Sequence, residues 1–176
     1  TLDQLQRILP YDSGSTMLVE GDQVAIKAWR GLGDYPAETI EGISFNLKTN
    51  QISGTVARSG EPMMITNVQE DPRWEKTPFR SQIKSWLGIP LWVRDRVIGL
   101  FSIDRNNELG FTSEEIALAQ TFASNAATAI DNARLYEAEE QRSNELMALR
   151  QASLSLTASL ELEAVLYAIL ESALHF

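Results

Sequence analysis

Residues 85–137 read SWLGIPLWVRDRVIGLFSIDRNNELGFTSEEIALAQTFASNAATAIDNARLYE, and this stretch is the most informative part of the chain. Two runs of β-forming residues come first, at 84–93 and 96–104, and Arg94 and Asp95 join them. A two-residue connection between such runs is typical of a β-hairpin, in which neighbouring strands pair antiparallel. The start of the stretch therefore predicts a hairpin.

A long helix should follow this hairpin. Thr112 and Glu115 have the spacing of a capping box, in which the hydroxyl accepts from the third helical amide and the carboxylate reaches back to the cap amide. From Ile116 to Ala133, apolar residues recur at three- and four-residue steps, and many are alanine. The pattern predicts a helix that begins near Ser113 and packs closely on a sheet.

The N-terminal half contains weaker signals of the same kind. Residues 15–19 and 23–30 are β-rich, and the short turn sequence between them predicts a second hairpin. Residues 51–59 suggest a short helix that ends at Gly60, and a strand is expected at 63–66.

Four motifs of the opening stretch resemble the C-terminal half of a GAF domain. They are a Ser-x-Leu-x-Ile-Pro-Leu strand from Ser85, an Arg-Val-Ile-Gly-Leu-Phe-Ser-Ile strand from Arg96, a Phe-Thr-x-Glu-Glu helix start at Phe111, and an Ala-x-Ala-Ile-x-Asn-Ala-x-Leu helix end from Ala127. The resemblance continues in a Gly-x-Val-Ala-x-x-Gly-x-Pro segment at 54–62.

The resemblance covers about residues 1–137 and implies an α+β fold. A GAF-like central antiparallel sheet of five or six strands should carry flanking helices and a long C-terminal signalling helix. The helix at 113–136 and the last helix should cover one face, and the loops around 31–50 and 67–83 should cover the other.

The predicted domain organisation has three parts: a GAF domain at 1–136, a helical connector at 137–158, and the first helix of a following, truncated GAF-like domain at 159–176. Ser159 could cap that last helix. The last helix resembles the first helix of a GAF domain, and we expect it to dock on a GAF core in the same or a neighbouring chain. Residues 137–176 carry seven acids and two bases, which favours an acidic connector over a second core.

The long helix also carries an interrupted heptad seam. Its apolar positions, counted from the end of the GAF-like region, are Ile130, Leu135, Leu146, Leu149 and Leu156. A helix that packs only on its own domain would explain the first of these positions. Beyond Tyr136 there is no local sheet to cover, so we expect a parallel homodimer through these helices.

Residue types limit the chemistry. The chain has no cysteine, which excludes a covalent bilin, a zinc-thiolate site and a thiol nucleophile. The single histidine, His175, lies outside the GAF-like region, which disfavours haem with an axial histidine. The sequence therefore predicts no cofactor, no metal site, no catalytic residue and no enzyme activity.

Cyclic nucleotide binding is also disfavoured. GAF domains that bind cyclic nucleotides carry an Asn-Lys…Phe-x-x-x-Asp-Glu signature, but here Asn106 and Asn107 precede Phe111 without the lysine. The acidic pair follows Phe111 one residue early. Helix capping explains these acids better than a ligand does.

The net charge of −9 opposes attraction to nucleic acid or to an anionic membrane surface. No apolar run approaches the roughly 20 residues that span a bilayer. We therefore expect a cytoplasmic segment without membrane contact, although a parent protein could carry membrane spans elsewhere.

Candidate ligand-binding residues are aromatic and basic. Trp74, Phe79 and Arg80 fall in or beside an irregular segment, 67–81, that could form a flap over a cavity, and Trp29 could add to an aromatic wall. Ordinary core packing for the aromatics and a solvated surface position for the arginine are the competing interpretations.

The resemblance implies a regulatory domain of a bacterial-type signal-transduction protein, such as a sensor histidine kinase of a two-component system or a cyclic-dinucleotide enzyme. Such a domain would bind a small molecule or a protein partner and relay its state through the helix to an output domain of the parent chain. The alternative is a structural dimerisation module without a ligand. A wet cavity would favour the first, and a collapsed one the second.

Overall fold

The computed structural model describes residues 2–32, 36–76 and 80–173. The chain divides into two compact units, residues 1–131 and 132–176. The first unit holds the sheet and its cores, and the second is part of a helix.

A six-stranded antiparallel sheet forms the centre of the first unit, in the order β3-β2-β1-β6-β5-β4. The strands are β1 (Ser13–Glu20), β2 (Gln23–Arg30), β3 (Ser44–Asn46), β4 (Met63–Ile65), β5 (Ser85–Val93) and β6 (Arg96–Arg105). The helices are α1 (Leu2–Ile8), α2 (Ala37–Glu41), α3 (Gln51–Ser59) and α4 (Ser113–Ala173). The expected GAF-like sheet of five or six strands is confirmed.

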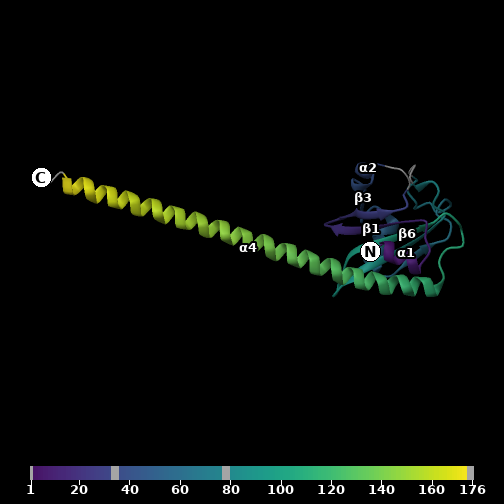
Figure 1. Cartoon of the computed structure of the whole chain (residues 1–176). Coiled ribbons are helices and arrows are strands. Elements are labelled where there is room, and N and C mark those ends of the chain that lie inside the picture. The colour runs from purple at the N-terminus through teal and green to yellow at the C-terminus, as the bar shows by residue number, and fades with distance from the viewer. Residues whose placement is uncertain (1, 33–35, 77–79, 174–176) are drawn as a thin grey trace. The chain divides into compact units, whose positions relative to one another are not determined.

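Two apolar cores lie on opposite faces of this sheet. Side chains alternate along a strand, so on β6 Phe101 and Ile103 join a core with α1 and the first turns of α4. Leu100 faces the other core, to which α2, α3 and the irregular segment before β5 contribute. In Figure 1, α2 and the first turns of α4 lie on opposite sides of the strands.

Local chemistry fixes the limits of α3. The Asn50 side chain accepts a hydrogen bond of 2.8 Å from the Ser53 amide and so caps the first turn. Gly60 ends the helix in the left-handed region, with φ of 66°. A Cβ at Gly60 would also lie 2.1 Å from the Trp92 ring, whose Nε1 donates to the Gly60 carbonyl at 2.8 Å.

The expected capping box starts α4. The Thr112 amide donates to Glu115 at 2.8 Å, and the Glu115 amide donates to the Thr112 hydroxyl at 3.2 Å. Glu115 of the acidic pair that was compared with the cyclic-nucleotide signature is therefore engaged in helix capping.

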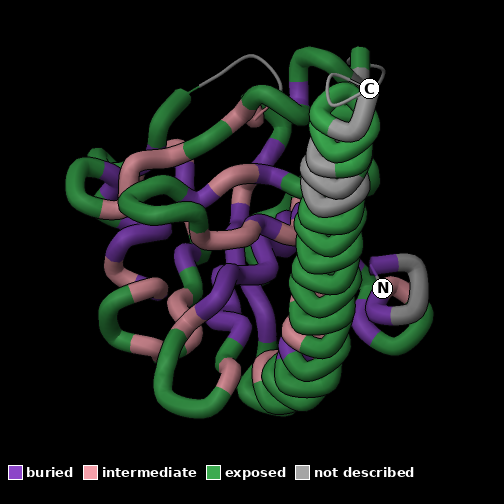
Figure 2. The backbone as a smooth tube through the Cα atoms, turned by 90° about the vertical axis from the view of Figure 1, so that its left-hand side faces the viewer, coloured by how far each residue is buried: buried purple, intermediate pink, exposed green. Residues whose placement is uncertain are grey.

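The second unit is a continuation of α4. The helix runs without a break through Ser159, where the sequence suggested a new helix start. From Leu135 on, every residue of the helix whose burial is described is exposed, as the green of the tube in Figure 2 indicates. Leu162, Leu166 and Ile169 are 50–61% exposed on this helix. The docking of the last helix on a GAF core, in the same or a neighbouring chain, stays a prediction.

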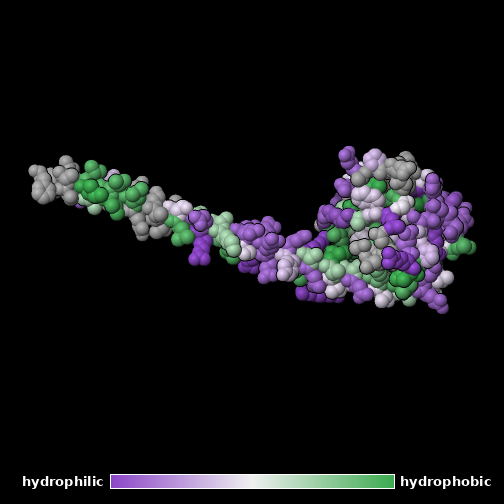
Figure 3. Space-filling model, in the orientation of Figure 1, coloured by the Kyte–Doolittle hydropathy of each residue, from purple (hydrophilic) through white to green (hydrophobic). Residues whose placement is uncertain are grey.

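Apolar residues gather toward the C-terminal end of this helix, and polar residues precede them (Figure 3). Of the predicted seam, Leu135, Leu146 and Leu149 are 55%, 60% and 67% exposed, and the side chain of Leu156 lies outside the described residues. Across the described part of the chain, no helix combines the length and apolar character that a bilayer span requires.

Candidate ligand cavity

A small cavity lies between the sheet and the irregular segment before β5. Its volume is about 30 Å³. Its lining comes from β1, β2, β3, β5, β6, α3 and the connecting segments: Ser15, Met17, Ile26, Leu32, Phe45, Ser53, Arg80, Ile83, Trp86, Ser102 and Asp104. A buried water needs roughly 10–15 Å³, so this volume suits two or three waters.

Asp104 provides the cavity's carboxyl group. Its side chain is buried, and Oδ2 accepts a hydrogen bond of 2.9 Å from the Ser13 hydroxyl. Oδ1 has no hydrogen-bond partner among the described residues. Burial raises the pKa of this carboxyl from its ordinary 3.8 to about 7, with a further rise from the Asp12 charge, although Arg80 and Ser13 act in the opposite direction.

Arg80 provides the cavity's cation. Its guanidinium carbon lies 3.6 Å from the centroid of the Trp74 ring and 5.5 Å from that of Phe45, so cation–π contacts hold it in place. Burial lowers the pKa of the Arg80 guanidinium, and the charges of Asp104 and Glu75 oppose this shift. Arginine remains protonated through such shifts.

Two tryptophans form the apolar wall behind these groups. The rings of Trp74 and Trp86 meet edge to face, with centroids 6.3 Å apart. Trp86 Nε1 donates to the Ser102 hydroxyl at 2.6 Å, whereas the buried Trp74 Nε1 has no partner within the described part of the chain. Gly88 makes room for this wall, because a Cβ there would lie 2.1 Å from Trp86.

Side-chain amides hold the irregular segment together and join it to the start of α3. Gln69 Nε2 donates to the Ile83 carbonyl at 2.8 Å and to the Arg80 carbonyl at 3.4 Å. Asn50 Nδ2 donates to Glu75 at 3.0 Å, which links the start of α3 to the segment. These bonds position Arg80 and Trp74 over the sheet.

The structure brings together two of the four residues that the sequence suggested for ligand binding. Arg80 lines the cavity, and the Trp74 ring is stacked against the Arg80 guanidinium. Trp29 does not line the cavity but a groove elsewhere on the sheet. Phe79 lies outside the described residues.

The polar residues that line the cavity on β1 and β6, Ser15, Ser102 and Asp104, were not predicted from the sequence. Ser15 lies opposite Ser102 in the pairing of β1 with β6, and Ser13 lies opposite Asp104. Polar residues at every second position of two otherwise apolar strands were the available signal, since such positions share one face.

The groove that contains Trp29 is larger and mostly apolar. Its volume is about 720 Å³. The lining comes from α1, β1, β2, β6 and the first half of α4: Leu2, Thr16, Leu18, Lys27, Ala28, Trp29, Arg30, Phe101, Phe122, Asn125, Ala126, Ala129 and Ile130.

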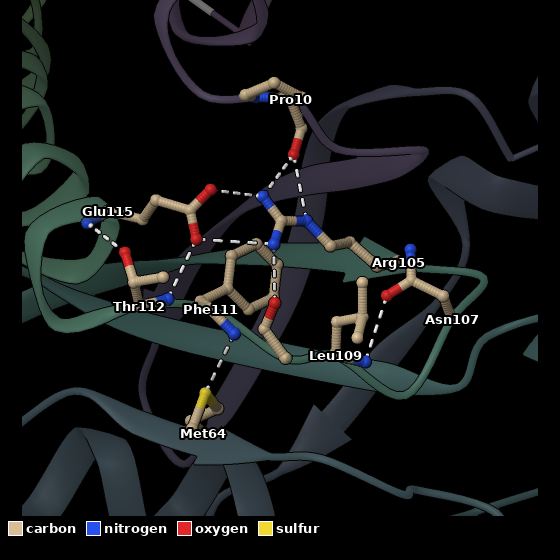
Figure 4. A network of polar contacts seen from close by, with 9 residues as sticks. Pro10, Met64, Arg105, Asn107, Leu109, Phe111, Thr112 and Glu115 are labelled. Carbon is tan, nitrogen blue, oxygen red and sulfur yellow. Dashed lines mark hydrogen bonds and ion pairs between the residues drawn. The ribbon is translucent and has the colours of Figure 1, made fainter.

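A cluster of polar contacts lies at the end of β6, directly after Asp104 (Figure 4). Arg105 Nη2 donates to Glu115 at 2.6 Å and to the Pro10 carbonyl at 2.8 Å, while Nη1 donates to the Gly110 carbonyl at 2.5 Å. The guanidinium also lies 4.2 Å from the centroid of Phe111. Bonding to Arg105 and Thr112 lowers the pKa of Glu115. Arg105 therefore joins the end of β6 to the first turn of α4.

The chain is similar to several solved GAF domains. With that of a phosphoenolpyruvate-protein phosphotransferase from Coxiella burnetii it shares 22% sequence identity and a TM-score of 0.68, over 77% of this chain and 81% of that one. With the GAF domain of a two-component sensor histidine kinase from Bacillus halodurans it shares 17% identity and a TM-score of 0.62, over 77% and 97%. At these identities the similarity shows the fold.

The chain is also similar to part of a curated protein. The chain is 28% identical over 145 residues to the probable 3',5'-cyclic phosphodiesterase pde-5 of Caenorhabditis elegans, which is 75% of this chain. It spans 20% of that protein's length. The model of the GAF domain family matches residues 1–131, the unit that holds the sheet, both cores and the cavity, and the chain therefore belongs to the GAF domain family.

Proposed function

We propose that this domain binds a small molecule in the cavity and relays its presence through α4 to an output domain of a cytoplasmic signalling protein. GAF domains are sensory and regulatory modules that occur in signalling proteins such as histidine kinases and phosphodiesterases. The observation that carries the proposal is the adjacency of Asp104 and Arg105 at the end of β6.

The relay rests on opposite orientations of these two side chains. Successive side chains of a strand point to opposite faces, so Asp104 lines the cavity while Arg105 bonds Glu115 of α4. A ligand that bonds Asp104 and shifts the end of β6 would also shift the Arg105 guanidinium. The first turn of α4 would follow, because Arg105 bonds both Glu115 and the Gly110 carbonyl just before the helix.

We propose that α4 pairs with its counterpart in a parallel homodimer and so connects the domain to the output domain. Leu135, Leu146 and Leu149 are exposed on α4 at heptad-compatible spacing, and such residues are buried when two helices pair. Parallel pairing would let both copies transmit a movement of the domain along one coiled coil to the output domain.

The small volume of the cavity favours a second candidate function. Arg80 lines the cavity with its guanidinium against the Trp74 ring, and the cavity measures only about 30 Å³. The domain would then act as a dimerisation module, and the helix would carry no ligand signal.

Hydrogen exchange separates the two functions. Freshly purified chain is compared with chain that has been unfolded, dialysed and refolded to remove bound small molecules. If a ligand is sensed, the stripped protein exchanges faster in residues 67–76 and in the first turns of α4. Equal exchange in both samples would favour the dimerisation module.

A further inference from the structure

We infer that the ligand of this cavity is a small amphoteric molecule of amino-acid size, which presents an acid oxygen to Arg80 and a hydrogen-bond donor to Asp104. This inference rests on the proposed function and names the chemical class of its ligand. Three features of the cavity carry it: its volume, an unpaired acceptor and an available cation.

Volume limits the size of the ligand. The cavity measures about 30 Å³, which suits two or three waters. Each water occupies about 30 Å³ in the liquid, so a ligand that replaces them has a volume on the order of 60–90 Å³. Glycine and acetate are of this size, whereas a nucleotide or a haem is several times larger.

Asp104 requires a donor. Its Oδ1 atom is buried and has no hydrogen-bond partner among the residues that the structure describes. An unpaired buried acceptor is costly, and a carboxylate forms its strongest bonds with charged donors. An ammonium or hydroxyl group of the ligand would satisfy Oδ1, and Ser13 would keep its bond to Oδ2.

Arg80 requires an acceptor. The Trp74 ring covers a face of the guanidinium, but guanidinium N–H groups lie in the plane, at the edges. No hydrogen bond or ion pair joins this guanidinium to another described side chain. A carboxylate matches such an edge with two parallel bonds. The unpartnered Trp74 Nε1 is a second buried donor beside it.

Ligands with only one of these groups fit less well. Above pH 7, where Asp104 is ionised, a simple anion such as acetate would pair with Arg80 but would leave Asp104 without a donor. A simple cation such as methylammonium would pair with Asp104 but would meet the charge of Arg80. An apolar molecule would satisfy neither group, so the pair of charges favours a molecule that carries both.

Indole resonances in a ¹H–¹⁵N NMR spectrum provide a direct test on the whole chain. Glycine and alanine are titrated above pH 7, where Asp104 is ionised, with acetate and methylammonium as single-group probes. We expect saturable shifts of the Trp74 and Trp86 Nε1 signals with at least one amphoteric probe, and at least tenfold weaker binding of both single-group probes. The Trp92 signal should stay fixed, because its Nε1 bonds Gly60.

Two substitutions test whether Arg80 and Asp104 bind the ligand. Arg80→Gln and Asp104→Asn should each weaken the binding of the amphoteric probe at least tenfold. Arg73→Gln is the matched control, because Arg73 pairs with Asp71 at 2.6 Å and does not line the cavity. The wild-type titrations keep the inference falsifiable even if a variant does not fold.

The outcomes separate the inference from the proposed function. If no amphoteric probe shifts Trp74 and Trp86 but another compound does, the inference is wrong and ligand sensing stands. If single-group probes bind as tightly as the amphoteric ones, the inference is also wrong. If no probe binds and the stripped and fresh proteins exchange hydrogen equally, both fail.

Discussion

The Asp104 carboxyl couples the cavity to pH. Burial raises its pKa to about 7, so between pH 4 and pH 7 the folded chain holds a proton that the unfolded chain has lost. The stability that this proton contributes is fully present below the ordinary pKa of 3.8 and is lost as the pH rises through 7. The groups that face the carboxyl are Ser13, Arg80 and Asp12.

Replacing Asp104 with asparagine should remove this dependence. Between pH 5.5 and pH 8, the wild type should lose about 2 kcal/mol of unfolding free energy relative to Asp104→Asn. Urea unfolding of both proteins at the two pH values measures the difference. Parallel pH profiles would show that Asp104 does not titrate in this range.

Gly60 tests how closely α3 and β5 approach. Gly60→Ala should cost about 3 kcal/mol of stability, because the left-handed backbone disfavours alanine and the new Cβ would overlap the Trp92 ring. Gly21→Ala is the matched control: its φ is 61°, but a Cβ there meets nothing within 4 Å, so the cost should be about 1 kcal/mol. Equal losses in urea unfolding would contradict the close contact.

At the residue scale, features that depend only on neighbouring residues, such as the ends of helices, could be predicted from the sequence. Thr112 and Glu115 formed the expected capping box, and Gly60 ended its helix as expected. The partners of Asp104 could not be predicted, because Ser13 meets it only through the pairing of β1 with β6, and that register is a long-range contact.

At the element scale, the joint between β6 and α4 depends on Arg105. Arg105→Gln should lower stability by about 2 kcal/mol, since the change removes charge-assisted bonds in a largely buried cluster. It should also raise hydrogen exchange in the first turns of α4. Arg96→Gln, at the exposed start of the same strand, is the control and should leave both unchanged.

The same variant tests the relay. In Arg105→Gln, removal of a bound small molecule should still raise exchange in residues 67–76 but should no longer affect α4. A response of α4 that persists in this variant would show that the signal takes another route.

Elements with a clear local signal were predicted, the short α3 and β4 among them, whereas α2 and β3 were not. The β5–β6 hairpin follows from two long β-forming runs with a two-residue connection, and the start of α4 follows from its capping box. The brief α2 and β3 lay inside a region that read as a loop, because five and three residues are too few to establish a period. The unbroken helix through Ser159 shows that a good capping residue does not by itself start a helix.

At the scale of the whole molecule, we propose that the exposed leucines of α4 determine the oligomeric state. Leu146→Ser combined with Leu149→Ser should convert the proposed dimer to a monomer, because both side chains belong to the predicted seam. Met147→Ser, at an exposed position between them, should leave the dimer intact. Sedimentation velocity distinguishes the states, and a wild-type monomer at micromolar concentration would contradict the proposed pairing.

Native mass spectrometry of freshly purified protein tests the central claim, that this domain senses a small molecule as a dimer. We expect a dimer that carries additional mass of about 100 Da or less per chain, because a ligand that replaces two or three waters in the cavity is of this size. This extra mass should disappear in Arg80→Gln and persist in Arg73→Gln. A wild-type dimer of bare polypeptide mass, under conditions that retain weak ligands, would contradict ligand sensing and leave the dimerisation module.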